Sequence, residues 1–196
     1  MLKLYSPKAA EGIIARYAPQ IGEISSRFAL PAACLKAILF QEITGIDLFD
    51  MLMDLLVQRN QRRGVSGAGR LQRADSSTGY AQIFGFVAIN AVNFAADSGL
   101  ASYGALGLPT DHRLDPAALP DIRLVWGRLH RDPVFNMTAA ALNLLSAAEE
   151  KTGRIDFPSY TPEELKRIFT RYNGTIPHVT PYGEAVYQHY LRYLDD

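Results

Sequence analysis

The sequence predicts an all-α domain, and three observations support this class. Apolar residues recur at intervals of three and four along most of the chain, which is the spacing of one face of a helix. Proline and capping residues stand where these segments begin, and glycine stands where several of them end. No segment alternates convincingly between apolar and polar residues and no repeat is visible, so strands are expected at most as a small hairpin before Ile83.

The first two helices are predicted from proline positions and apolar spacing. Ser6 as N-cap and Pro7 at the first helical position open a helix that runs to about residue 28, with a bend or break at Pro19. The segment from 31 to about 45 follows as a second helix, which ends near a glycine. This second helix is the most apolar, and we expect it to be mostly buried.

A third, amphipathic helix is predicted from Asp47 to about Asn60. Its leucines share one side and its aspartates lie near the other, so the acidic row is expected to face solvent. The leucines are Leu48, Leu52 and Leu55, and the aspartates are Asp47, Asp50 and Asp54.

The segment 61–79 has no periodicity and is expected to be a long irregular loop, a feature that is uncommon without a function. Asp132 and Gly153 bound an Ala- and Leu-rich helix, and the capping box at 161–164 opens the next one. Further helices are predicted at about residues 83–98, 122–130, 133–151, 162–172 and 186–194.

Length and composition indicate one ordinary globular domain over residues 1–196. Of these residues 48% are hydrophobic and 20% are charged, and the chain is long enough to bury a core. Twenty basic side chains balance twenty acidic ones, so no overall field favours nucleic acid as a partner. One cysteine, Cys34, and four histidines at scattered positions predict no disulfide, no metal centre and no hydrolase triad.

The N-terminal segment carries Lys8, Glu11 and Arg16 where a signal peptide would be apolar, so no signal peptide is visible. No apolar run approaches the roughly 20 residues of a membrane helix, and we expect no stable membrane insertion. Localisation and protein partners stay open.

Glu42 is the residue that most needs an explanation, because it stands near the carboxyl end of the most apolar predicted helix. The negative end of the helix dipole and apolar neighbours both disfavour an ionised carboxyl there. We therefore expect a raised pKa, which suits a general acid. The alternative is that Glu42 faces solvent at a helix end or pairs with an arginine of the loop.

Three short motifs occur in a defined order along the chain. They are the Glu42 helix end, the turn Gly79-Tyr80-Ala81-Gln82-Ile83 and the motif Tyr172-Asn173-Gly174 before the last helix. This order resembles the lysozyme-like fold of glycoside hydrolase family 23, which contains the soluble lytic transglycosylases and goose-type lysozymes. The resemblance spans roughly residues 8–194.

The resemblance implies a peptidoglycan-cleaving glycosidase that acts on the β-1,4 bond between N-acetylmuramic acid and N-acetylglucosamine. Glu42 would be the acid and then the base, and no metal or organic cofactor is needed. The products are anhydro sugars in a lytic transglycosylase and reducing sugars in a muramidase. The expected partner is a peptidoglycan glycan strand, reached by phage-type lysis, by dedicated secretion or as part of a longer chain. The implied substrate-binding residues are Ser77, Thr78, Gly79, Tyr80, Gln82, Tyr172, Asn173 and Tyr182.

The chain departs from the family pattern at the centre of these motifs. Ile43 stands where the family commonly has Ser, and Tyr80 and Ala81 replace Leu and Met. The hydroxyl that orients the catalytic carboxyl is therefore either missing or supplied from elsewhere. A catalytically inactive lysozyme-like module for glycan binding or interaction is the alternative function.

Asp75 is the best candidate for a second carboxylate that positions water, with a turn-forming role as the alternative. Asp47 and Asp50 are weaker candidates, for which a solvated surface role is favoured. The loop arginines are expected either to meet carboxylates or an anionic polymer of the cell wall or to pair weakly with surface acids. They are Arg59, Arg62, Arg63, Arg70 and Arg73.

Overall fold

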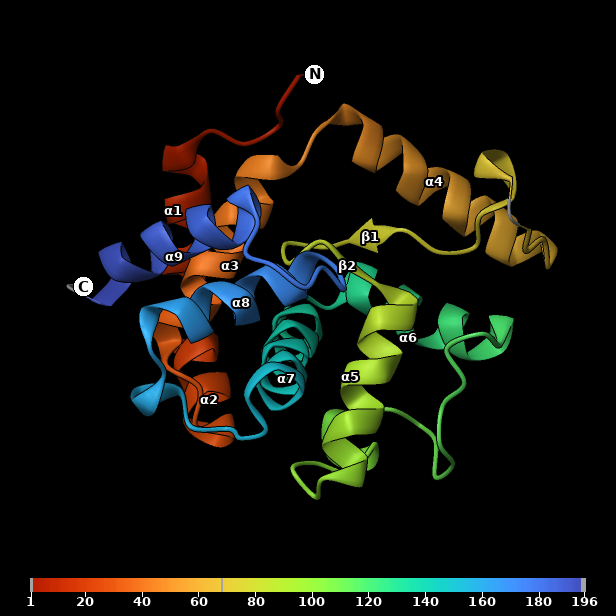
Figure 1. Cartoon of the computed structure of the whole chain (residues 1–196). Coiled ribbons are helices and arrows are strands. Elements are labelled where there is room, and N and C mark those ends of the chain that lie inside the picture. Colours follow the sequence, from red (N-terminus) through yellow and green to blue (C-terminus); the bar gives the residue numbers. More distant parts are fainter. Residues whose placement is uncertain (1, 68, 195–196) are drawn as a thin grey trace.

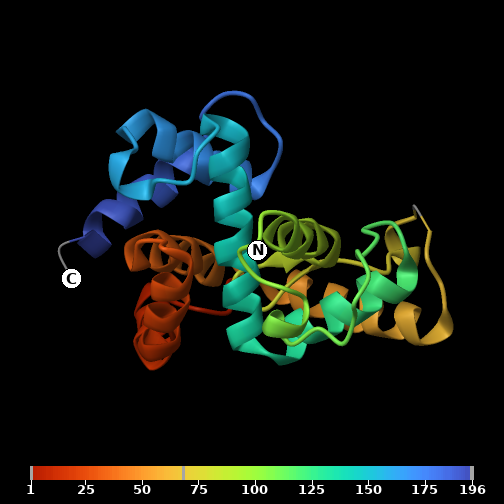
Figure 2. The ribbon, with the colours of Figure 1, turned by 90° about the horizontal axis from the view of Figure 1, so that it is seen from below.

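A long helix, α7 (Pro133–Thr152), runs through the middle of the molecule (Figure 2). The computed structural model describes residues 2–67 and 69–194. Helix α7 packs against α2, α3, α5, α6 and α8, which explains its almost unbroken run of buried residues. The other helices are α1 (Pro7–Arg16), α2 (Ala18–Phe28), α3 (Ala32–Gly45), α4 (Leu48–Arg63), α5 (Gly85–Asp97), α6 (Leu119–Arg131), α8 (Pro162–Asn173) and α9 (Pro181–Leu194).

The described part of the chain is all-α, as predicted, apart from one small hairpin of β1 (Ser77–Thr78) and β2 (Ile83–Phe84). Short 3-10 turns add η1 (Arg70–Gln72), η2 (Gly104–Leu106) and η3 (Phe157–Ser159). No helix in this part is both long and apolar enough to cross a membrane.

The predicted first helix is in fact two helices, α1 and α2, which meet at Tyr17. The break falls two residues before Pro19, which then occupies the first turn of α2, where its missing N–H leaves no helix bond unmade. The predicted cap is confirmed, since the Ser6 side chain accepts a hydrogen bond from the Ala9 N–H at 3.2 Å.

Helix α3 is buried along most of its length, as expected from its apolar sequence. It packs against α1, α2 and above all α9. This packing brings the last helix of the chain alongside the end of α3 that carries Glu42.

Helix α4 lies apart from the helical core and contacts mainly β1 and η1 (Figure 1). The expectation that its aspartates face solvent was wrong. Asp47 caps the helix and is 5% exposed, whereas Leu52 and Leu55 are 55% and 60% exposed. The aspartates turn inward because backbone N–H groups and buried hydroxyls are there to hydrogen-bond them.

The hairpin is fixed to α7 by Asn136. The Asn136 amide donates to the Thr78 carbonyl at 2.9 Å, and its oxygen accepts from the Ala81 N–H at 2.8 Å. Gly79 has a φ of 71°, and a Cβ there would collide with this amide. The predicted helix from Ile83 begins instead at Gly85, because Ile83 and Phe84 pair with β1.

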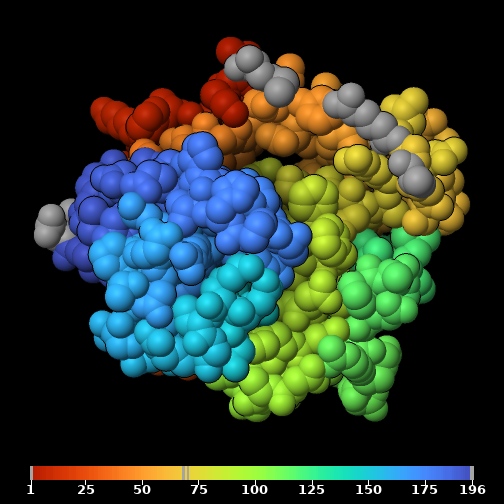
Figure 3. Space-filling model, in the orientation of Figure 1, coloured from red at the N-terminus to blue at the C-terminus, as the bar shows by residue number. Residues whose placement is uncertain are grey.

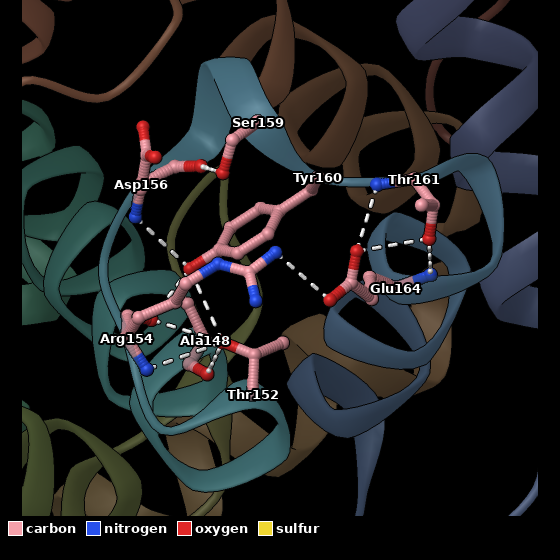
Figure 4. A network of polar contacts seen from close by, with 8 residues as sticks. All are labelled: Ala148, Thr152, Arg154, Asp156, Ser159, Tyr160, Thr161 and Glu164. Carbon is pink, nitrogen blue, oxygen red and sulfur yellow. Dashed lines mark hydrogen bonds and ion pairs between the residues drawn. The ribbon is translucent and has the colours of Figure 1, made fainter.

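The start of α8 is held by a polar network at the end of α7 (Figure 4). The predicted capping box is present, with Thr161 and Glu164 each accepting from the other's backbone N–H. Arg154 pairs with Glu164 at 2.9 Å, and the Tyr160 hydroxyl donates to the Arg154 carbonyl at 2.5 Å. The network sets the position of α8, whose other end carries Tyr172 and Asn173.

Candidate active site

Glu42, on the last turn of α3, lies where two surface cavities of about 400 and 270 Å³ meet. Both cavities are lined by Glu42, Gln82, Phe84 and Asn173, so together they form one groove. Figure 3 shows a hollow in this part of the surface, between the orange segment of α4 and the blue C-terminal helices. The structure thus brings together residues from the three sequence motifs.

The groove continues beyond the second cavity along α4. A third cavity of about 500 Å³ shares Asp50, Ser77 and Phe84 with it and reaches Arg73. The three cavities that share these residues form one elongated groove.

Burial raises the pKa of Glu42 from 4.5 to about 7. A hydrogen bond from Tyr182 acts in the opposite direction, and the nearby negative charge of Asp50 adds to the increase. Glu42 forms no ion pair with any arginine of the described residues, so its carboxyl is not neutralised by a cation. A carboxyl with this pKa exists in both protonation states near neutral pH.

The hydroxyls of two tyrosines, Tyr182 and Tyr172, donate hydrogen bonds within the site. The Tyr182 hydroxyl, at the start of α9, donates a hydrogen bond to Glu42 Oε1. The Tyr172 hydroxyl, near the end of α8, donates to the Ala81 carbonyl at 2.8 Å and so ties α8 to the hairpin turn. Burial and the charge of Glu42 raise the pKa of both phenols well above the ordinary value, so both remain donors.

Tyr182 supplies the hydroxyl that Ile43 lacks. The Ile43 side chain is fully buried in the core. The hydroxyl that contacts the Glu42 carboxyl comes instead from the far end of the chain.

Gln82, in the hairpin turn, lines both cavities together with Glu42. Its amide donates to the Gly79 carbonyl at 2.8 Å, and its oxygen accepts from the Ser77 hydroxyl at 3.2 Å. The Gln82 backbone has a φ of 43°, a conformation that is unfavourable for a residue with a side chain. Strain of this kind persists where the surroundings enforce it, often at functional sites.

Thr78, Gly79 and Tyr80 were expected at the sugar-binding wall, but none of them lines this groove. Thr78 is fully buried, and its hydroxyl contacts Asp54 at 2.7 Å. Gly79 and Tyr80 line a further cavity, which borders the groove because Asp50 and Gln82 also line it, and there Tyr80 packs against Tyr17.

Asp75 does not line the groove either. Its carboxylate accepts hydrogen bonds from the Gly85 and Phe86 N–H groups, at 2.8 and 2.9 Å, and so caps the start of α5. The structure places the two weaker candidates, Asp47 and Asp50, in the cavity that Glu42 lines. Asp50 also accepts from the Asp47 N–H at 2.9 Å, which fixes its orientation.

Asn143 of α7, which the sequence analysis did not identify, lines the larger cavity of the groove. Its side chain is 5% exposed, and its amide nitrogen has no hydrogen-bond partner among the described residues. An unsatisfied buried donor is energetically costly. The signal available in the sequence was an asparagine within the Ala- and Leu-rich stretch 139–145. Arg171, paired with Glu150 at 2.5 Å, lines the same cavity.

The loop arginines do not gather at the groove. Arg73 reaches its far end, Arg62 lines a separate pocket, and Arg59 and Arg63 are exposed on α4. The Arg70 side chain lies outside the described residues.

An Asp54, Thr78 and His130 cluster does not form a catalytic triad. Both the Thr78 hydroxyl, at 3.0 Å, and Asp54, at 3.3 Å, contact the same ring nitrogen, Nδ1, of His130. A triad requires the nucleophile and the acid on opposite nitrogens. The described residues also contain no group of His, Cys, Asp and Glu side chains that could hold a metal ion.

Comparisons of the chain with protein-family models, with curated proteins and with solved structures found no match.

Proposed function

We propose that this protein is a lysozyme-like glycosidase that cleaves the peptidoglycan backbone between N-acetylmuramic acid and N-acetylglucosamine. The observation that carries the proposal is Glu42, a carboxyl with a pKa of about 7 in a groove, with no cation paired to it. Such a group can give up a proton and take one back at neutral pH. The order of the three motifs in the sequence supports the same class.

In the first step Glu42 donates its proton to the oxygen of the glycosidic bond. That bond breaks, and positive charge develops on the neighbouring sugar. Because Oε1 accepts from Tyr182, the transferred proton is carried by Oε2. The ionised carboxylate is then stabilised by the hydrogen bond that Tyr182 already makes.

In the second step the Glu42 carboxylate takes a proton back. When the donor is the hydroxymethyl group of the cleaved sugar, its oxygen bonds to the anomeric carbon and closes an anhydro ring. When the donor is water, the product has a reducing end. Asp50 lines the same cavity as Glu42, and we propose that it orients such a water.

The polar groups of the larger cavity favour an N-acetylated sugar. The free amide nitrogen of Asn143 needs an acceptor, and the carbonyl of an acetamido group provides one. Asn90 and Asn173 line the same cavity and add further amide groups.

The test is digestion of purified peptidoglycan by the wild type, Glu42→Gln and Glu23→Gln, with products identified by mass spectrometry. Glu42→Gln keeps the size and the hydrogen-bond acceptor but removes the acid. Glu23→Gln makes the same change at an exposed carboxyl on α2. We expect products from the wild type and Glu23→Gln and none from Glu42→Gln.

The kind of product decides between the two routes. Anhydro-muramoyl ends identify a lytic transglycosylase, and reducing ends identify a muramidase. If folded wild type releases no product but binds the glycan, the catalytic proposal fails and the protein is a glycan-binding module.

A further inference from the structure

A second pocket, of about 370 Å³, lies between α4 and α6 and shares no lining residue with the groove at Glu42. Three arginines dominate it, one from α4 and two from α6. Its lining includes Arg62, Arg123, Arg131, Gln58, Trp126 and His130.

The three arginines carry positive charge that the described part of the chain does not neutralise. Arg62, Arg123 and Arg131 form no ion pair with any described carboxylate, and no acidic side chain lines the pocket. Arg128, also on α6, shows the contrast, because it pairs with Asp132 at 3.3 Å. Three unpaired guanidinium groups around one cavity repel each other and attract an anion.

The carboxylate of Asp54, which contacts His130 of the pocket, is held by other groups. Asp54 contacts His130 Nδ1 at 3.3 Å and accepts hydrogen bonds from the hydroxyls of Ser76 and Thr78. It does not line the pocket. An anion that balances the charge of the three arginines must therefore come from outside the described part of the chain.

The walls of the pocket are fixed before any ligand binds. Trp126 is buried, stacks on His130 with ring centroids 5.0 Å apart, and donates to the Ser76 carbonyl at 3.0 Å. The Gln58 amide contacts the other His130 nitrogen at 3.0 Å and joins α4 to α6. Fixed walls reduce the entropy that binding would cost.

We propose that this pocket binds a phosphate group. A guanidinium group donates in a planar fork that matches phosphate oxygens, and several can bind one phosphate at once. A carboxylate is balanced by a single arginine, whereas three arginines match a doubly charged or repeated anion. The proposal concerns binding and is independent of Glu42.

The phosphate could come from two sources, free inorganic phosphate or the phosphodiesters of an anionic polyol-phosphate polymer. A nucleic acid is disfavoured, because the chain is neutral overall and the arginines surround one pocket instead of forming a stripe. The binding experiment separates these cases.

Isothermal titration calorimetry at low ionic strength tests the proposal with inorganic phosphate, poly(glycerol phosphate) and duplex DNA as probes. The pocket variant is Arg62→Gln/Arg123→Gln/Arg131→Gln. The control variant, Arg16→Gln/Arg59→Gln/Arg63→Gln, loses the same net charge at exposed arginines that line none of the cavities described. Circular dichroism confirms that both variants fold, and Glu42→Gln is titrated in parallel.

We expect the wild type, Glu42→Gln and the control variant to bind a phosphate probe, and the pocket variant to bind at least about tenfold more weakly. Equal affinity for both phosphate probes identifies free phosphate, and tighter binding of the polymer identifies the phosphodiester. The proposal is overturned if the wild type binds neither, if both variants lose affinity equally, or if DNA is bound most tightly.

Discussion

The Tyr182 hydroxyl donates a hydrogen bond to Glu42 from a position 140 residues further along the chain. This bond is the main effect that opposes burial in setting the pKa of Glu42, whereas the charge of Asp50 acts together with burial. The two neighbours therefore allow the acidity of Glu42 to be changed in both directions while the carboxyl itself is kept.

Tyr182→Phe is expected to move the alkaline limb of the pH–activity profile to higher pH. Removal of the hydrogen bond destabilises the carboxylate, so the pKa of Glu42 rises above about 7 and the acid stays protonated up to a higher pH. The rate at the optimum should also fall, because the carboxyl is less well oriented. The measurement is initial rate of peptidoglycan solubilisation against pH.

Asp50→Asn provides the opposite change. Removal of a neighbouring negative charge makes ionisation easier, so the pKa of Glu42 falls and the alkaline limb moves to lower pH. Limbs that move in the same direction in both variants would contradict this account of the site. If Asp50 also orients water, reducing-end products should decrease in this variant.

Glu42 should reduce the stability of the folded protein at alkaline pH. The pKa of Glu42 in the folded protein lies above the ordinary 4.5. The stabilising contribution of its protonated form is therefore fully present below pH 4.5 and is lost as pH rises through about 7. Glu42→Gln, which stays neutral, should therefore be more stable than the wild type at about pH 8, by up to about 3 kcal/mol, and nearly equal to it at about pH 4.

Urea unfolding at the two pH values measures this difference. Glu23→Gln serves as the control, because its exposed carboxyl should give the same small change at both. If Glu42→Gln is more stable than the wild type by the same amount at both pH values, ionisation of Glu42 is not what lowers stability at alkaline pH.

The backbone at Gln82 can be tested with two truncations. Gln82→Ala and Gln82→Gly both remove the side chain from the groove, but only glycine adopts a φ of 43° without strain. The glycine variant should be the more stable by about 1 kcal/mol, with both variants losing activity. Equal stabilities in thermal unfolding would mean that the left-handed backbone carries no strain.

Replacement of Asn143 should increase the stability of the folded protein and weaken substrate binding. Asn143→Leu removes the unpaired buried donor, so we expect stability to increase by about 1 kcal/mol or more. Loss of the donor should raise KM for N-acetylated glycan while kcat changes little, because no hydrogen bond joins Asn143 to Glu42 among the described residues. A fall in kcat with constant KM would assign Asn143 a different role.

Local signals in the sequence predicted much of the fold. Asp132 with Gly153, and Thr161 with Glu164, marked helix ends that depend only on neighbouring residues. Glu42 could be identified because a carboxyl in an apolar helix is unusual. Its partner Tyr182 could not be identified as the missing hydroxyl, since the contact depends on how α9 packs against α3.

The orientation of α4 shows a second limit. Periodicity divides a helix into two faces, but it does not say which face meets the rest of the protein. The buried face is decided by hydrogen-bond partners from β1 and α6, which are remote in sequence: the hydroxyls of Ser76 and Thr78 and the ring of His130 all contact Asp54.

Substitutions on the two faces of α4 test this reversed orientation directly. Leu55 is 60% exposed, so Leu55→Gln should change the free energy of unfolding by no more than about 0.5 kcal/mol. Asp54→Ala leaves the Ser76 and Thr78 hydroxyls without their acceptor, and should cost about 1 to 3 kcal/mol. Urea unfolding of both variants gives the comparison. If Leu55→Gln proves the more damaging, the leucine face is covered by a partner in solution, and the aspartate face is not what holds α4 in place.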